Sequence, residues 1–228
     1  MLYHFPTREA LVEAVIEEAR AVGRPAVALT FEPHPRAFFA PDAPMFRLTG
    51  SAAKERVFRR LGLDGLIVRR FDAGLAATSA RDFVVGLLWR DLGLSGVVIG
   101  HDFHFGRGRE GNPALLAELC REAGLACRIV PAVAPEAGAA PVSSSAIRQA
   151  LTGGDVAAAN ALLGYRWFVD GIVRHGDKRG RTLGYPTANI RLDKNCGLKH
   201  GIYAVRVGIG DKRFDGVASF GRRPTFDN

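Results

Sequence analysis

The chain has 228 residues, of which 47% are hydrophobic and 24% charged, and its formal net charge at pH 7 is +8. This length and balance are ordinary for one large or two small globular domains, and they exclude a fibrous or low-complexity chain. The N-terminal stretch carries acidic residues throughout, so it does not predict a signal peptide, and no segment reaches the roughly 18 apolar residues of a membrane span. The sequence therefore predicts a cytoplasmic protein without a membrane partner.

The positive charge allows three classes of partner, namely nucleic acid, a membrane surface and anionic small molecules. The basic residues form separate clusters, and no basic run with interleaved aromatic residues is present. Cys120, Cys127 and Cys196 show no metal-ligand spacing and are typical of reduced thiols. These patterns favour small anionic ligands, with a basic nucleic-acid-binding protein as the alternative.

The first 150 residues or so alternate between helical and strand patterns, which is typical of a parallel sheet. Helices are expected at 8–22, about 51–61, 80–92 and after Asn112. Short, apolar strands are expected at 26–31, 65–71, 96–103 and 127–133. The sequence therefore predicts a doubly wound α/β domain, whose ligands should lie at the carboxyl ends of the strands.

The pattern changes after Gly164. Two short helices, at about 144–152 and 155–163, are followed by strand patterns without helices, including a hairpin at 202–220 that turns at Gly210-Asp211. This part predicts a small antiparallel β domain or barrel. The expected organisation is an α/β domain at 1–152, a linker helix at 153–165 and a β domain at 166–228.

Three stretches of the α/β part have the residue types of a binding site. TFEPHP (30–35) places His34 between two prolines in a rigid turn, although such a histidine is more often structural than catalytic. GHDFHFGRGREGN (100–112) offers aromatic faces to a flat heterocycle and arginines beside glycines to phosphate oxygens, although its alternating phenylalanines are also compatible with a core strand. VSSSAIRQAL (142–151) places three serines at a helix N-terminus with Arg148 one turn later. Such an arrangement can bind an anion, or the serines can serve only as caps.

The stretch VRHGDKRGRTLGYPTANI (173–190) gives the most specific signal. Its glycines recur at every fourth residue among cationic side chains, so main-chain N–H groups can approach phosphates closely. Pro186 then restricts the chain before Thr187 and Asn189, whose oxygens can bind Mg²⁺ or a phosphate. A polar hairpin loop is the less favoured alternative, because it needs neither the regular glycines nor the tetrapeptide PTAN (Pro186–Asn189).

These motifs resemble a known family. HGDKRGRTLGYPTANI, GIYAVRV and GVASFGRRPTF are similar to the riboflavin kinase module, and TFEPHP, GHDFHFGRG and SSSAIRQAL are similar to the FMN adenylyltransferase module. In this order they resemble the bacterial bifunctional riboflavin kinase/FAD synthetase. The resemblance implies a nucleotidyltransferase-like sheet followed by a β-barrel. It also implies ATP and Mg²⁺ as cofactors, with riboflavin, FMN and FAD as substrates and products.

The resemblance also implies roles for individual residues. Ser144, Ser145 and Arg148 would bind ATP phosphates for adenylyl transfer, and the flavin or adenylate would be lined by Asp102, Phe105 and Gly106. In the kinase part, Thr187 and Asn189 would hold the magnesium ion of Mg-ATP. The phosphates there would be surrounded by Gly176, Gly180, Arg181 and Gly184.

Two departures from the family pattern shape the expectation for this chain. The histidine-bearing first strand of the family is not found before residue 8, and the glutamate that serves the kinase as general base is not found before Asn228. The fold is therefore expected to be a sheet without its first strand and an incomplete barrel, marginally stable and without appreciable synthesis of FMN or FAD. A catalytically dead flavin- or nucleotide-binding remnant is the alternative interpretation.

Overall fold

The structure is a computed structural model that describes residues 6–131, 143–175, 184 and 187–221. Contacts divide the chain into two compact units. The first, called here the α/β unit, comprises His4–Met45 and Thr49–Pro141. The second, called the C-terminal unit, comprises Phe46–Leu48 and Val142–Asn228, so a short segment of the N-terminal half belongs to it.

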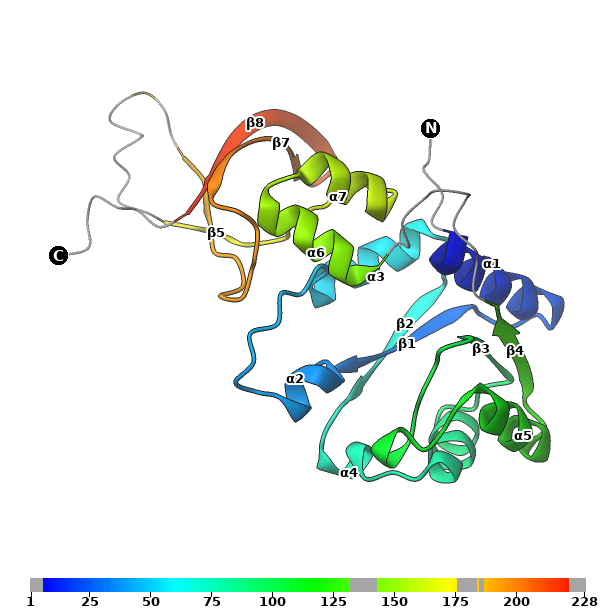
Figure 1. Cartoon of the computed structure of the whole chain (residues 1–228). Helices are drawn as coiled ribbons and strands as arrows, with labels where there is room; N and C mark the ends of the chain where they lie inside the picture. Colours follow the sequence, from blue (N-terminus) through cyan, green and yellow to red (C-terminus); the bar gives the residue numbers. More distant parts are fainter. Residues whose placement is uncertain (1–5, 132–142, 176–183, 185–186, 222–228) are drawn as a thin grey trace, which may run out of the picture. The chain divides into compact units, whose positions relative to one another are not determined.

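Helices and strands alternate along the α/β unit, as predicted (Figure 1). Its elements are α1 (Pro6–Ala21), β1 (Val27–Glu32), α2 (Pro35–Phe39), α3 (Ser51–Arg60), β2 (Gly65–Arg70), α4 (Ala73–Ala76), the π-helix η1 (Asp82–Asp91), β3 (Gly96–Gly100), the 3₁₀ turn η2 (Arg107–Arg109), α5 (Pro113–Ala123) and β4 (Ala126–Val130). The helix expected at 80–92 is thus a π-helix over most of its length. The short elements α2, α4 and η2 were not predicted from the sequence.

Local hydrogen bonds explain where two of these helices begin. The Ser79 hydroxyl donates to the Asp82 carboxylate at 2.7 Å, and the Asp82 backbone N–H donates back to the Ser79 hydroxyl at 3.0 Å. Asn112 Oδ1 accepts from the Leu115 N–H at 3.0 Å, and Pro113 follows at the first helical position. These caps satisfy N–H groups that have no partner within the helix.

The strands of the α/β unit pair in parallel. β1 pairs with β2 from Val27 opposite Gly65 to Glu32 opposite Arg70, and β3 pairs with β4 from Gly96 opposite Ala126 to Gly100 opposite Val130. Among the described residues these are two separate two-stranded sheets, without a ladder between β1 and β3. The α/β class with parallel strands is confirmed, whereas one continuous sheet is not formed by the described strands.

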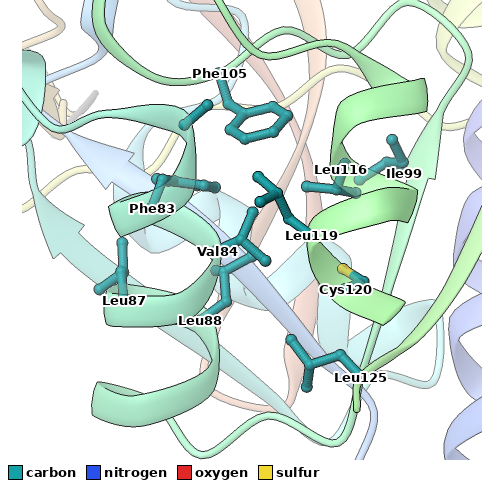
Figure 2. Close-up of a cluster of buried hydrophobic side chains, with 11 residues drawn as sticks. Phe83, Val84, Leu87, Leu88, Ile99, Phe105, Leu116, Leu119, Cys120 and Leu125 are labelled. Atoms are coloured by element: carbon teal, nitrogen blue, oxygen red, sulfur yellow. The ribbon is translucent and has the colours of Figure 1, made fainter. Parts of the chain in front are cut away.

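One buried cluster holds η1, β3 and α5 together (Figure 2). Its members are Ala80, Phe83, Val84, Leu87, Leu88, Ile99, Phe105, Leu116, Leu119, Cys120 and Leu125. Leu29 and Phe31 of β1 pack against the cluster. Removing so many apolar side chains from water is the main stabilising contribution in a unit of this size.

The C-terminal unit begins with two helices and continues with strands. Its elements are α6 (Ser144–Gly153), α7 (Val156–Leu163), β5 (Val173–Arg174), β6 (Asn189–Ile190), β7 (Gly201–Ile209) and β8 (Lys212–Phe220). β5 pairs with β6 and β7 with β8, both antiparallel. The β7–β8 hairpin turns at Gly210, whose φ of +57° suits glycine, so this predicted hairpin is confirmed. The predicted boundary between 152 and 166 stays a prediction.

Candidate functional site

The carboxyl end of β3 places Asp102 at the surface of the α/β unit. β3 stops at Gly100, three residues short of its predicted end, and the His101 N–H donates to the Val130 carbonyl at 3.0 Å. A Cβ at Gly100 would lie 3.2 Å from Asp102 Oδ1 and 3.9 Å from Leu11 of α1. The Asp102 carboxylate therefore lies against the strand end, exposed, where ligands of parallel sheets bind.

Phe105 and Gly106 have structural roles that agree with the alternative of core packing. The Phe105 side chain is only 6% exposed, and its ring lies 5.3 Å from that of Phe83 and 5.6 Å from that of Phe103, between centroids. Gly106 has a φ of +74°, and a Cβ there would lie 2.8 Å from the Ala80 backbone nitrogen. Their contact with a flavin or adenylate stays a prediction.

The glycine-arginine turn at 106–111 is held by its own hydrogen bonds. The Arg107 N–H donates to the Thr78 carbonyl at 2.7 Å, and the Arg109 N–H donates to the Gly106 carbonyl at 3.0 Å. The Glu110 carboxylate accepts from the Ala80 N–H at 2.6 Å. The N–H groups of Arg107 and Arg109 are engaged in these bonds, whereas both arginines are exposed.

The carboxyl end of β1 carries an ion pair that the sequence did not predict. Lys54 of α3 forms an ion pair with Glu32 at 2.8 Å, and both side chains are about one-fifth exposed. His34 caps α2 by accepting from the Arg36 N–H at 3.1 Å, which is a structural role for the histidine of TFEPHP. The acid at the end of a buried strand, followed by a basic helix, was the signal for this ion pair.

A surface cleft of about 290 Å³ lies between α1 and β4. It is lined in part by Glu13, Glu17 and Arg128. Arg128 Nη1 lies 2.7 Å from Glu17 Oε2 and 3.2 Å from Glu18 Oε1, and these two hydrogen bonds raise the pKa of the Arg128 guanidinium. Because the two glutamates already neutralise this arginine, the cleft is poorly suited to a phosphate.

The N-terminus of α6 has the geometry that the serine motif predicts. Ser143 is the N-cap, with its hydroxyl accepting from the Ala146 N–H at 3.1 Å, and Ser144 and Ser145 occupy the first turn. Arg148 lies one turn later on the same side of the helix as Ser144. Its Nε donates to the Phe46 carbonyl at 2.7 Å, a partner that the sequence did not predict.

The glycine-rich stretch 173–190, called here the kinase-type motif, is described only in part. Gly176, Gly180 and Arg181 lie outside the described residues. Gly184 has a φ of +80°. Thr187 is exposed, and Asn189 opens β6 directly opposite Arg174 of β5. An exposed hydroxyl and an amide two residues apart can both face a ligand outside this strand pair.

A carboxylate-rich metal cage is not found in the described part of the chain, where no group of three His, Cys, Asp or Glu side chains could hold a metal ion. Nor is any helix described there that has the length and apolarity to cross a membrane. Asp102, Phe105 and Gly106 belong to the α/β unit, whereas Ser144, Ser145, Arg148, Thr187 and Asn189 belong to the C-terminal unit.

Two family models match the chain in succession. Residues 8–146 match FAD synthetase and residues 163–228 match riboflavin kinase. A bifunctional riboflavin kinase/FMN adenylyltransferase of Escherichia coli K12 is 39% identical over 217 residues, which are 95% of this chain and 69% of that protein. Its counterpart in Haemophilus influenzae is 35% identical over 212 residues, with coverages of 92% and 68%.

A solved structure is also similar. A crystal structure described as a macrolide-efflux protein from Streptococcus pneumoniae shares 32% identity and a TM-score of 0.78, covering 96% of this chain and 71% of that one. The matches in both halves confirm the resemblance seen in the motifs and favour flavin chemistry over nucleic-acid binding. The chain belongs to the bifunctional riboflavin kinase/FMN adenylyltransferase family, whose enzymes act in flavin cofactor biosynthesis.

Proposed function

We propose that the N-terminus of α6 binds the phosphates of ATP for adenylyl transfer to FMN. The observation that carries this proposal is the joint placement of a capped helix start, two hydroxyls and a cation within one turn. Backbone N–H groups at a helix start attract anions, and the planar guanidinium of Arg148 can bind phosphate oxygens through two parallel hydrogen bonds. Ser144 and Ser145 add hydroxyl donors at the same end.

In this proposal the FMN or adenylate lies at the carboxyl end of β3. Asp102 is the group best placed for a polar contact, because its carboxylate is exposed beside the strand end. Phe105 and Gly106 would support the loop after β3 through its packing. The Phe105 ring lies in the buried cluster, and Gly106 approaches Ala80 closely. Their substitution would then change flavin affinity through the shape of the site.

We further propose that Thr187 and Asn189 hold Mg-ATP in the riboflavin kinase step, with the phosphates surrounded by Gly176, Gly180, Arg181 and Gly184. The donor set fits the ion, because Mg²⁺ prefers oxygen ligands and usually combines one or two protein ligands with phosphates and water. When bound, Mg²⁺ supplies charge neutralisation of the phosphates. The side chains themselves orient the nucleotide.

A cytoplasmic location suits the three free cysteines.

ADP is a product of the kinase step, and the part of its binding that depends on Thr187 reports on the kinase site. We expect the chain to bind ADP with Mg²⁺, and Thr187→Ala to weaken this binding by about 10-fold, because a hydrogen bond or metal contact to a charged group is lost. Isothermal titration calorimetry with and without Mg²⁺ measures the change. Chelation of Mg²⁺ by EDTA should weaken binding to the wild type more than to the variant.

The matched control is Thr152→Ala, which removes an exposed hydroxyl from α6 in the same unit. It should leave ADP affinity unchanged. If Thr187→Ala binds ADP with the affinity of the wild type, Thr187 has no ligand role and the tetrapeptide is structural.

A further inference from the structure

One short segment of the N-terminal half, Phe46–Leu48, is held by residues from the C-terminal half of the chain. Arg148 Nε donates to the Phe46 carbonyl at 2.7 Å, and Trp167 Nε1 donates to the Leu48 carbonyl at 2.8 Å. Both hydrogen bonds are partly buried, which makes them worth more than exposed ones. All of these residues belong to the C-terminal unit.

The rings add a second constraint on the same segment. The Phe46 ring meets the Trp167 ring edge to face, with centroids 6.2 Å apart and planes at 83°. Gly197 lies against the same ring, because a Cβ there would lie 2.9 Å from the Phe46 ring. The Leu48 side chain is buried. The segment therefore has little freedom to move its two carbonyls.

Trp167 is itself tied to the helix that packs beside the helix of Arg148. Its backbone N–H donates to Asn160 Oδ1 of α7 at 2.6 Å, and α7 packs against α6. The contacts form a closed circuit that runs from α6 through Arg148 to the segment, through Trp167 to α7, and back to α6. Figure 1 shows α6 and α7 side by side. A displacement of any member must break at least one of these contacts.

We infer that Trp167 is a positioning residue for Arg148 in adenylyl transfer, acting through the backbone of Phe46–Leu48. This inference rests on the proposed role of Arg148 in phosphate binding. The Nε bond fixes the plane of the guanidinium, so its terminal N–H groups have a set direction before the ligand arrives. The Trp167 indole holds the acceptor segment, and thus the plane of Arg148, in place.

The two family matches give this circuit a functional meaning. Trp167 lies within the part that matches riboflavin kinase, whereas Phe46 and Leu48 lie within the part that matches FAD synthetase. A residue of the kinase part therefore supports phosphate binding for the other reaction. Sequence analysis gave Trp167 no role, because its two partners are 119 and 7 residues away along the chain.

Inorganic pyrophosphate is a suitable probe, because it is the leaving group of adenylyl transfer and not of the kinase step. Trp167→Phe keeps an aromatic ring but removes the indole N–H donor together with the five-membered part of the indole. We expect it to weaken pyrophosphate binding by about 2- to 12-fold, the range for one neutral hydrogen bond. Arg148→Lys keeps the charge but loses the fork and the Nε donor, and should weaken binding by about 10- to 100-fold.

The decisive measurement is a double-mutant cycle followed by calorimetry in the presence of Mg²⁺. If Trp167 acts through Arg148, Trp167→Phe has no further effect in the Arg148→Lys background. An undiminished effect in that background assigns Trp167 a merely structural role and overturns the inference. So does an unchanged affinity of Trp167→Phe when Arg148→Lys weakens binding. Trp89→Phe, at an exposed tryptophan of the α/β unit, is the matched control and should bind as the wild type does.

The outcomes also separate this inference from the proposed function. Absence of pyrophosphate binding by the wild type, or an unchanged affinity of Arg148→Lys, overturns the phosphate site itself. If Trp167→Phe loses the circular dichroism spectrum of the wild type, Asn160→Ala carries the same test. That variant removes the acceptor of the Trp167 backbone N–H, and its effect should also vanish in the Arg148→Lys background.

Discussion

The core of the α/β unit and the β7–β8 hairpin of the C-terminal unit differ in the solvent exposure of their apolar residues. In the α/β unit, η1, β3 and α5 bury a cluster in which Leu116 and Val84 are fully inaccessible. In the hairpin, Ile202 is 78% and Val217 is 76% exposed. Among the described residues, the hairpin thus exposes large apolar side chains, whereas η1, β3 and α5 bury theirs in one cluster.

This difference indicates where stability and binding reside. Regions with more buried apolar contacts are locally more stable, and segments that bind ligands commonly belong to the less stable regions of a protein. The kinase-type motif lies in the unit with the more exposed strands, while the strand-end residue Asp102 lies on the packed unit. The comparison can be tested by substituting matched residues in the two regions.

Leu116→Ala should give the largest effect. The side chain is fully buried in the cluster, so truncation removes transfer free energy and leaves a cavity, at a cost of about 3 kcal/mol in the free energy of unfolding. Val217→Ala, on the exposed face of the hairpin, should cost less than about 0.5 kcal/mol. Urea titrations followed by circular dichroism compare the two. Equal losses would show that the hairpin face is covered in solution.

The alkaline pH dependence of stability should be the next largest effect. Burial, with a smaller contribution from neighbouring Cys127, raises the pKa of Cys120 from 9.0 to about 12, and burial also raises the pKa of Cys127. The unfolded chain then loses these thiol protons at lower pH than the folded chain does. Stability contributed by the neutral Cys120 thiol is therefore complete below pH 9 and falls as the pH rises above 9, by about 1.4 kcal/mol per pH unit. The Cys127 thiol changes stability in the same direction.

Urea unfolding of the wild type and Cys120→Ala at pH 8.5, 9.5 and 10.5 measures this dependence. The variant loses some stability at every pH through its cavity, so the informative quantity is the slope, which should be shallower than in the wild type. Cys196→Ala, in the C-terminal unit, is the matched control for loss of a thiol. Parallel slopes for Cys120→Ala and the wild type would contradict the assignment.

Much of this fold follows from local patterns, which is why the sequence predicted it. The hairpin at 202–220 and α5 are found where turn and capping residues indicated them, because Gly210, Asn112 and Pro113 act on their immediate neighbours. β3 is shorter than predicted because the chain turns after Gly100, where the Phe103 N–H donates to the Gly100 carbonyl at 3.2 Å. Apolar alternation through Phe103 gave no indication of this turn.

The candidate site was predictable in residue type and less so in geometry. Capping chemistry placed the serines at the start of α6 correctly, since a cap depends on residues within one turn. The alternation of Phe103 and Phe105 was equally compatible with a ligand face and with the core, and burial in the cluster favours the core. The partner of Arg148 is 102 residues away, so no local pattern could indicate it.

Thr30→Val should give the smallest effect, and of opposite sign. Thr30 lies in β1, and its hydroxyl is buried without a hydrogen-bond partner in the described part of the structure. A buried hydroxyl without a partner costs free energy, so its replacement by a methyl group of similar size should stabilise the α/β unit by about 1 kcal/mol. Ser219→Val, at an exposed position of β8, should change stability by no more than about 0.5 kcal/mol.

Urea unfolding of both variants, with and without FMN, separates two roles of the hydroxyl. A stabilised variant with unchanged FMN affinity makes the Thr30 hydroxyl a defect of an otherwise satisfied core. A destabilised variant, or one that binds FMN more weakly, shows instead that the hydroxyl has a partner in solution.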